Sequence, residues 1–260
     1  MTESIEDLIL QHDKRGIADL RSHLPVDYCT RAGQYVLDHP GDVAISTGFY
    51  ILPAGGPETD GPPGAIAIGK ALENLGRRVS YISDTYTTPI LHGLLGSQAH
   101  VEEFPIGDAK ASRGWASDLL ARIKPSLLIS IERCGRTVGG SYLNMRGADI
   151  TPFTARLDYL FDMGIPSVGI GDGGNEIGMG NLAKFIPTVS SLPSDPAISK
   201  VDRLVIASVS NWGGYGLVAG LSKLTGRNLL PSVEQETALI RHIVELVFWI
   251  PNLFVQRMKY

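Results

Sequence analysis

Short apolar runs that alternate with helical segments constrain the fold of this chain more than any other feature. Runs typical of strands occupy residues 42–47, 78–83, 100–104, 127–131, 165–170 and 202–208. Helical spacing follows or separates them at residues 65–75, 89–95, 112–124, 152–163, 175–185, 213–224 and 233–246. Strands that alternate with helices form parallel sheets covered on both faces. We therefore predict an α/β fold, a Rossmann-like doubly wound three-layer sandwich with a mostly parallel sheet of about six strands in the order 3-2-1-4-5-6.

The segments outside the strand–helix alternation extend this prediction to a single α/β domain. Its parts are N-terminal packing helices over 1–40, an α/β core over 41–246 and an apolar tail over 247–260. The first helices are expected over 3–22, with a break near Gly16, and over 26–37. The tail has no clear period, so it either docks on the core or on another subunit, or differs from the natural end of such a domain. Residues 187–200 are rich in Ser and Pro and predict an exposed loop or lid.

Composition excludes several classes of partner. The net charge is −4 over 260 residues, so no broad basic face is expected to bind nucleic acid or an anionic membrane. No apolar run approaches 18 residues, and the first ten residues do not form a signal peptide. Two cysteines cannot build a disulfide framework, which favours a reducing, cytoplasmic setting. The expected partner is a small-molecule carboxylate substrate, and a homo-oligomer stays open.

Residues 169–180 are the most unusual stretch, because six of the twelve are glycine. They follow a predicted buried strand, at the end of a sheet where open α/β folds bind ligands. Glycine allows the backbone to approach a ligand closely. Gly169, Gly171 and Gly174 satisfy the G-x-G-x-x-G pattern, but a dinucleotide site is disfavoured because the strand comes late and Asp172 would face phosphate with like charge.

Acidic residues gather in the loops that leave the carboxyl ends of the predicted strands. They are Glu58, Asp60, Glu132, Asp172 and Glu176. Carboxylates held close together repel, which raises at least one pKa and supplies an acid or base near neutral pH. The same oxygens could hold a divalent cation such as Mg²⁺ or Mn²⁺, for which we name Asp172 and Glu176, with Asp60 as a further candidate. The spacing of His and Cys residues disfavours zinc.

Three arginines, Arg133, Arg136 and Arg146, follow the fourth predicted strand. A guanidinium binds carboxylate or phosphate through a two-pronged fork, so these residues are candidate anchors for an anionic substrate. The alternative is that each pairs with a carboxylate of its own loop, such as Glu132 or Asp149.

Several of these motifs together resemble one known family. They are Glu132-Arg133-x-Gly135-Arg136, Gly140-x-Tyr142-x-Asn144-x-Arg146, Glu58-Thr59-Asp60-Gly61-Pro62 and the glycine stretch. They resemble the carboxyl-terminal domain of the D-glutamate cyclase family, over roughly residues 25 to 245. The resemblance implies a carbon–oxygen lyase that converts D-glutamate to 5-oxo-D-proline and water, or that acts on a similar small dicarboxylic amino acid.

This chemistry needs a base near the amine, an acid near the leaving oxygen and cationic anchors for the carboxylates. We assign Glu132, Asp172 and Arg136 as catalytic residues, with the two carboxyl groups as base and acid in either order. The candidates for substrate binding are Glu58, Asp60, Arg133, Asn144, Arg146, Gly173, Gly174 and Asn175. The backbone N–H groups of Gly173 and Gly174 are expected to stabilise an oxyanion, aided by a helix that starts at Asn175.

Two other readings stay open. One is a nucleotide- or phosphosugar-binding enzyme that uses the same crevice, although the chain has no P-loop. The other is a non-catalytic module that binds a small acid.

Overall fold

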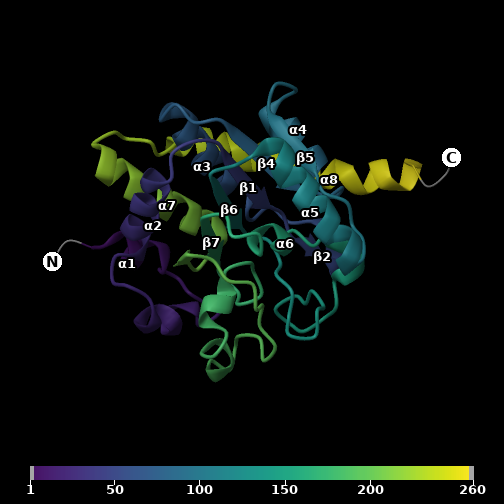
Figure 1. Cartoon of the computed structure of the whole chain (residues 1–260), viewed down its shortest axis with the longest axis horizontal. Helices are drawn as coiled ribbons and strands as arrows, with labels where there is room; N and C mark the ends of the chain where they lie inside the picture. The colour runs from purple at the N-terminus through teal and green to yellow at the C-terminus, as the bar shows by residue number, and fades with distance from the viewer. Residues whose placement is uncertain (1–2, 258–260) are drawn as a thin grey trace.

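The computed structural model describes residues 3–257, with side chains up to residue 247. Its centre is a six-stranded sheet, in which every neighbouring pair is parallel (Figure 1). In spatial order the strands are β5 (His100–Glu103), β4 (Val79–Ser83), β1 (Val43–Thr47), β6 (Leu127–Ile131), β7 (Ser167–Gly171) and β8 (Arg203–Ile206). This is the order 3-2-1-4-5-6, so the predicted doubly wound α/β fold is confirmed.

Helices cover the sheet. They are α1 (Ile5–Ile9), α2 (Tyr28–Asp38), α3 (Pro62–Asn74), α4 (Thr88–Leu95), α5 (Ala109–Ile123), α6 (Asp158–Phe161), α7 (Ser210–Thr225) and α8 (Val233–Arg257). Short 3-10 helices are η1 (Ile17–His23), η2 (Leu52–Ala54), η3 (Thr151–Phe153), η4 (Met179–Leu182) and η5 (Ile186–Thr188), and β2 (Tyr50–Ile51) pairs with β3 (Gly56–Pro57). Helix α7 packs against α2 and α3, and α5 packs against α6 (Figure 1).

The central strands are apolar because they are buried on both faces. All five positions of β1, β6 and β7 are buried, and β6 reads Leu-Leu-Ile-Ser-Ile. Parallel strands between two helical layers need such continuous apolar runs. The register pairs Thr47 with Ile131 and Ile131 with Ile170, so β1 and β6 end at one level and β7 ends one residue beyond it. The residues that come directly after them, including Glu132 and Asp172, therefore meet at one edge of the sheet.

Two predicted helices do not form. Residues 152–163 contain only η3 and the single turn α6, because this segment is extended at Thr154 and the Ala155 carbonyl oxygen accepts a hydrogen bond from Arg133. Residues 175–185 begin with an antiparallel bridge between Glu176 and Cys134 instead of a helix. The backbone groups that a helix would use are already bonded across loops, since the Gly135 N–H donates to the carbonyl of Asn175 (2.9 Å).

The break predicted near Gly16 is confirmed, since a turn in which Gly16 has a φ of 81° separates α1 from η1. Two other segments differ in part from the prediction. Residues 187–200 form a loop with exposed positions such as Ser191, but Leu192 and Ala197 are buried and the Ala197 N–H donates to the carbonyl of Gly174 (3.1 Å). Helix α8 does not stop at residue 246, since its backbone stays helical to Arg257. Whether the apolar tail docks on a surface lies outside the described side chains.

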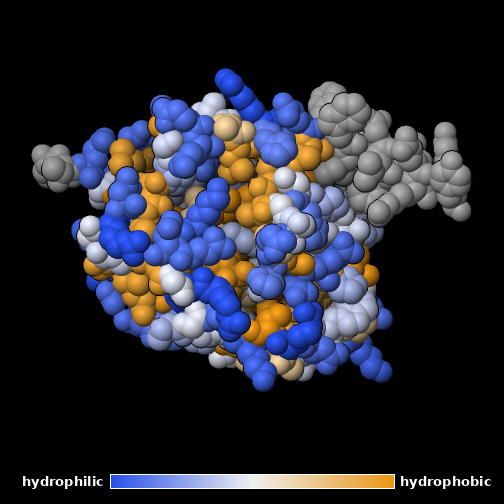
Figure 2. All heavy atoms as spheres, turned by 90° about the horizontal axis from the view of Figure 1, so that it is seen from above, coloured by the Kyte–Doolittle hydropathy of each residue, from blue (hydrophilic) through white to orange (hydrophobic). Residues whose placement is uncertain are grey.

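No helix among the described residues is long and apolar enough to span a membrane. Seen from above in Figure 2, the surface carries hydrophobic residues in patches that hydrophilic residues interrupt.

Candidate functional site

A cavity of about 500 Å³ opens at the carboxyl edge of the sheet. Its charged and amide lining residues are Arg15, Glu58, Glu132, Asn144, Arg146, Asn175 and Glu176. Apolar side chains, Phe49 and Met145 among them, complete the wall. A hollow with a few convergent polar groups at this place in an α/β sheet is the expected form of a ligand site.

Glu132 occupies the first position after β6 in a strained conformation. Its φ is 45°, in the left-handed region that residues other than glycine rarely adopt. The carboxyl group is buried and accepts a hydrogen bond from the Ser210 hydroxyl. Burial raises the pKa of Glu132 well above its usual value, and the neighbouring Asp172 and Glu58 carboxylates raise it further. Glu132 is therefore a buried group that favours holding a proton.

Asp172 follows β7 and is fully buried. Its Oδ1 contacts Nη1 of Arg15, whereas its Oδ2 has no hydrogen-bond partner among the described residues. Burial raises the pKa of Asp172 well above its usual value, Glu176 adds to the rise, and Arg15 opposes it. Asp172 is thus the carboxyl group of the cluster with a direct cationic partner.

Glu58 and Asp60 come from the loop after β1. Desolvation raises the pKa of Glu58 to about 8, and Asp60 contributes to the rise. Asp60 lies at the start of α7, where Oδ2 accepts from the Ser210 N–H (3.1 Å) and Oδ1 from the Asn211 N–H (2.8 Å). Burial raises the pKa of Asp60, and these backbone bonds oppose the rise. This carboxylate therefore also caps a helix.

Glu176 closes the glycine loop on itself. Its Oε2 accepts from the Gly174 N–H (2.9 Å), and the Gly173 N–H contributes as well. Burial raises the pKa of Glu176 despite these bonds. The two N–H groups that the sequence suggested for an oxyanion are thus directed at a carboxylate, and no helix starts at Asn175. The predicted oxyanion site is wrong in this arrangement.

Asn144 and Asn175 also line the cavity. Asn144 Oδ1 accepts from the N–H groups of Arg146 and Ala148, both at 3.0 Å. Asn175 Nδ2 donates to the carbonyl of Leu143 at 2.9 Å. Both amides line the cavity, but these bonds also hold the loop that carries Arg146.

A family model described as D-glutamate cyclase-like, C-terminal, matches residues 5–249. The chain belongs to the D-glutamate cyclase-like family. A human relative, the mitochondrial D-glutamate cyclase, is 33% identical over 204 residues, which are 71% of this chain and 33% of the relative. The chain therefore spans about a third of the length of that relative.

Two solved structures that resemble the chain are distant from it. The alcohol dehydrogenase of Thermococcus sibiricus complexed with 5-hydroxy-NADP is 13% identical with a TM-score of 0.30, and 72% of each chain is covered. The apo form of LigD from Sphingobium sp. strain SYK-6 is 13% identical with a TM-score of 0.30, over 79% of this chain and 96% of the other. Likenesses this weak say nothing about the ligand of this D-glutamate cyclase-like chain.

Two arginines of the family motifs, Arg133 and Arg136, do not line the cavity. Arg133 is buried, pairs with Asp84 at 2.6 Å and donates to the carbonyls of Gly48 (2.9 Å) and Ala155 (2.7 Å). These partners lie in three different loops, so Arg133 holds the loops together. Its prediction as a substrate anchor is corrected accordingly, because a buried guanidinium that is already paired cannot leave its partner cheaply.

Arg136 belongs to a second network beside the cavity. Its Nη1 contacts Asp158 Oδ2 at 2.6 Å, and its Nη2 contacts Asp162 at 2.9 Å. Asp158 is fully buried and also accepts hydrogen bonds from Tyr142 and Ser199. Arg136 therefore holds the loop after β6 against Asp158 and Asp162, and it does not line the cavity. Its prediction as a catalytic residue is corrected accordingly.

Arg15 is a charged residue of the cavity that the sequence analysis missed. It lies in the N-terminal turn between α1 and η1, and its guanidinium reaches Asp172 across 157 positions of sequence. Asp13 shapes the turn, since its Oδ1 accepts from the N–H of Arg15 (2.8 Å). The one local signal is the Asp-Lys-Arg-Gly sequence at residues 13–16, which is typical of any surface turn.

Three carboxylates could hold a cation together. One oxygen each from Asp60, Glu132 and Asp172 lies within 4.8 Å of the others, and Asp172 Oδ2 has no partner among the described residues. Three oxygen ligands of this kind fit a hard divalent ion. The predicted Asp172 belongs to this trio, whereas the predicted Glu176 does not.

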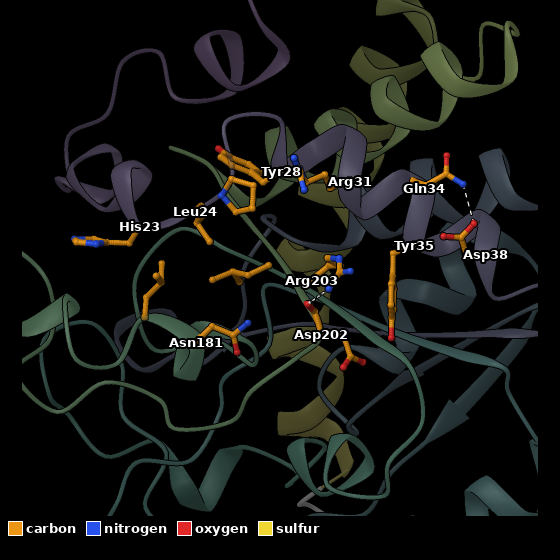
Figure 3. Close-up of a pocket in the computed structure, with 13 residues that line it drawn as sticks. His23, Leu24, Tyr28, Arg31, Gln34, Tyr35, Asp38, Asn181, Asp202 and Arg203 are labelled. Atoms are coloured by element: carbon orange, nitrogen blue, oxygen red, sulfur yellow. Dashed lines mark hydrogen bonds between the residues drawn. The ribbon is translucent and has the colours of Figure 1, made fainter.

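A second hollow, of about 600 Å³, lies along α2 and the start of β8 (Figure 3). Four of its polar residues bond in pairs: Gln34 donates to Asp38 at 2.8 Å, and Arg203 donates to the carbonyl of Asp202 at 2.8 Å. It shares no lining residue with the carboxylate cavity, and we assign it no part in the chemistry.

Proposed function

We propose that the chain is a hydro-lyase that converts D-glutamate, or a similar small dicarboxylic amino acid, to the five-membered lactam and water. Membership of the D-glutamate cyclase-like family supports the substrate class. One observation carries the proposal further: Glu58, Glu132 and Glu176, each with a raised pKa, face Arg15 and Arg146 across one small cavity. Such a site combines groups that hold protons with groups that bind carboxylates.

The reaction forms a C–N bond between the amine and the γ-carboxyl carbon, and it breaks a C–O bond of that carboxyl. The amine attacks only after it loses a proton, and the departing oxygen leaves as water only after it gains protons. A γ-carboxyl group among buried acids is itself favoured in its neutral form, because like charges repel in a desolvated site. The neutral acid is the form that loses water most readily.

We assign Glu132 as the proton donor and Asp172 as the base. Burial and the surrounding carboxylates raise the pKa of Glu132, so Glu132 favours holding its proton, and Glu58 lies in hydrogen-bonding contact with it. Asp172 is the carboxylate that Arg15 favours in its ionised form. Burial raises the pKa of both groups, and the opposing effect of Arg15 on Asp172 is the difference on which this assignment of acid and base rests.

The anchors for substrate carboxylates are Arg15 and Arg146 in place of Arg133 and Arg136. Both line the cavity, and Arg146 has no ion-pair partner within residues 3–247. One guanidinium lies beside the buried carboxyl groups, and the other lies on an exposed loop at the cavity wall. A dicarboxylate with an amine between its charged ends matches this distribution of charge.

We further propose that, in a state in which Glu132 has released its proton, Asp60, Glu132 and Asp172 are ligands of a divalent cation, Mg²⁺ or Mn²⁺. A bound cation would offset the negative charge of the cluster and polarise a carboxyl oxygen of the substrate.

The test is product formation by the purified full-length chain. D-Glutamate is incubated with the protein in EDTA, Mg²⁺ or Mn²⁺, and 5-oxoproline is measured by chiral chromatography and mass spectrometry against a protein-free control. We expect 5-oxo-D-proline from the wild type and none from Glu132→Gln, which should keep its melting temperature. A well-folded wild type that consumes neither enantiomer of glutamate under any of these conditions contradicts the proposal. Saturable binding without turnover would indicate a small-acid-binding module instead.

A further inference from the structure

The N-terminal turn and the loop over residues 187–200 hold each other at the mouth of the cavity. The Ser191 hydroxyl donates to the carbonyl oxygen of Arg15 at 2.6 Å, and Ser191 lines the same cavity. A Cβ atom on Gly16 would lie 2.8 Å from Val189, so the two segments are in close contact. Asp13 binds the N–H groups of Arg15 and Gly16 from the other side. The backbone of Arg15 is therefore fixed, and its side chain is the part that is free to move.

The side chain of Arg15 is in a position to exchange partners. It is 40% exposed, whereas the Asp172 side chain that it contacts is 1% exposed. Only Nη1 of the guanidinium bonds to a residue within 3–247, which leaves its other donors open to the cavity. The guanidinium contacts Asp172 and also interacts electrostatically with the carboxylates of Glu132 and Glu176. A carboxylate that enters the cavity meets a cation held by a single contact.

We propose that Arg15 captures a carboxylate of the substrate, and that its contact with Asp172 is the resting state of the site. The incoming carboxylate takes the guanidinium through its two-pronged fork, and Asp172 is thereby uncovered. The carboxylate of Asp172 then lacks a cationic partner and faces the bound amine as a base. This inference rests on the proposed function, because it names the residue that selects the substrate of that same site.

The exchange predicts opposite effects for the two members of the ion pair. Removal of the guanidinium removes the anchor, so an acid should bind more weakly. Removal of the Asp172 charge frees the anchor from its internal competitor, so the same acid should bind more tightly. If the ion pair served only to hold the N-terminal turn in place, loss of either member would weaken binding alike.

The experiment measures binding of glutarate by isothermal titration calorimetry, with the full chain in EDTA. Glutarate has both carboxylates of glutamate but no amine, so it cannot cyclise. Relative to wild type, we expect Arg15→Gln to bind about tenfold or more weakly, Arg15→Lys to lie between them and Asp172→Asn to bind more tightly. The control Arg21→Gln, which loses an exposed pair with Asp7 at 2.7 Å, should bind as wild type does. Thermal melts confirm that each variant is folded.

Three outcomes overturn the inference: wild-type affinity in Arg15→Gln, weaker binding in Asp172→Asn, or no binding of glutarate by the wild type. If Asp172→Asn does not fold, the glutarate affinities of Arg15→Gln, Arg15→Lys and the wild type decide the question. The inference then requires weaker binding in Arg15→Gln and intermediate binding in Arg15→Lys. Product formation does not enter this test. A chain that binds glutarate through Arg15 but never forms 5-oxoproline would contradict the proposed function and leave the inference standing. A chain that forms 5-oxoproline but binds glutarate equally well without Arg15 would contradict the inference and leave the proposed function standing.

Discussion

Glu132 bears two unfavourable features at one position, a left-handed backbone and a buried carboxyl group. Strain of this kind persists where the surrounding structure imposes it, and it concentrates at functional sites. Here the next residue, Arg133, is tied to three loops, so the backbone has little freedom to relax at Glu132. The strain directs the carboxyl group toward Ser210 and the cavity.

Replacement of Glu132 by glycine should therefore raise the free energy of unfolding by about 1 kcal/mol, because glycine adopts a positive φ without penalty. The same change should lower turnover at least about 100-fold. The matched control is Lys124→Gly, since Lys124 has the same φ of 45° at the exposed end of α5. Urea unfolding should show both variants stabilised, and kinetics should show only Glu132→Gly inactive. A destabilised Glu132→Gly would contradict this prediction and mean that the lost contacts of the side chain, such as the hydrogen bond from Ser210, outweigh the relief of strain.

Glu58 gives a pH dependence whose sign follows from its pKa of about 8, against an ordinary value of 4.5. Between these values the folded chain holds a proton that the unfolded chain has released. The free energy of unfolding therefore falls as pH rises from about 4.5 to 8 and stops falling above that. In Glu58→Gln, the decrease of the free energy of unfolding over this pH range should be smaller than in the wild type by about 1–3 kcal/mol. Denaturant titrations from about pH 5 to 9 measure it, with the exposed Glu73→Gln on α3 as a control that keeps the wild-type slope.

At the scale of elements, the start of α7 links the proposed cation site to the stability of the fold. Helix α7 has no side-chain cap of its own, and Asp60 from the loop after β1 supplies the acceptor for its first N–H groups. In the other direction, Oδ1 of Asn211 in the first turn of α7 accepts hydrogen bonds from the N–H groups of Gly61 (3.0 Å) and Gly64 (2.8 Å) at the start of α3. The ends of α3 and α7 are thereby locked together, next to the carboxylate cluster.

Asp60→Ala should lower the free energy of unfolding by about 1–2 kcal/mol, because the first turn of α7 loses its acceptor. It should also lower turnover, since Asp60 belongs to the proposed cation site. Asp108→Ala is the matched control: Asp108 caps α5 by accepting from the Ala111 N–H at 2.8 Å, away from the cavity. Its loss should lower stability by about 1 kcal/mol and leave turnover unchanged. Equal activity in the two variants would show that Asp60 is only a cap.

At the scale of the whole molecule, the cavity depends on segments that are far apart in sequence. The N-terminal turn at residues 11–16 and the loop at 187–200 meet over the ends of β6 and β7, and neither segment carries the family motifs. Two glycines with nearly the same backbone separate the effect of this contact from the effect of φ alone. Gly16 has a φ of +81° and is tightly packed, whereas Gly76 has a φ of +80° and no atom within 4 Å of an added Cβ.

Both Gly16→Ala and Gly76→Ala should lose about 1–2 kcal/mol of stability from the left-handed backbone. Gly16→Ala should lose more, because its methyl group meets Val189 and Ser191 at less than 3 Å. It should also weaken glutarate binding, since the contact that positions Arg15 is displaced. Denaturant titration and calorimetry test both statements. If the two variants match in stability and binding, the contact between the segments does not position the anchor.

The order of the strands and the place of the carboxylates could be derived from the sequence alone. Hydrophobic periodicity is a local property, and parallel strands that end in register bring the residues after them to one edge. Glu132 and Asp172 could be placed together for that reason. The lost helices at 152–163 and 175–185 show the limit of the method, because tertiary hydrogen bonds there outweighed a weak local preference.

What only the tertiary structure decided was the partner of each arginine. A guanidinium on a flexible stem pairs with whichever carboxylate the finished fold brings near, and no local pattern encodes that choice. Arg133 therefore pairs with Asp84, and Arg136 pairs with Asp158. The cation beside the buried carboxyl groups of the cavity is Arg15, which lies in a turn with no distinctive sequence pattern. The sequence by itself determined where the negative charge gathers, since that follows from the ends of strands. The source of the positive charge depended on long-range packing.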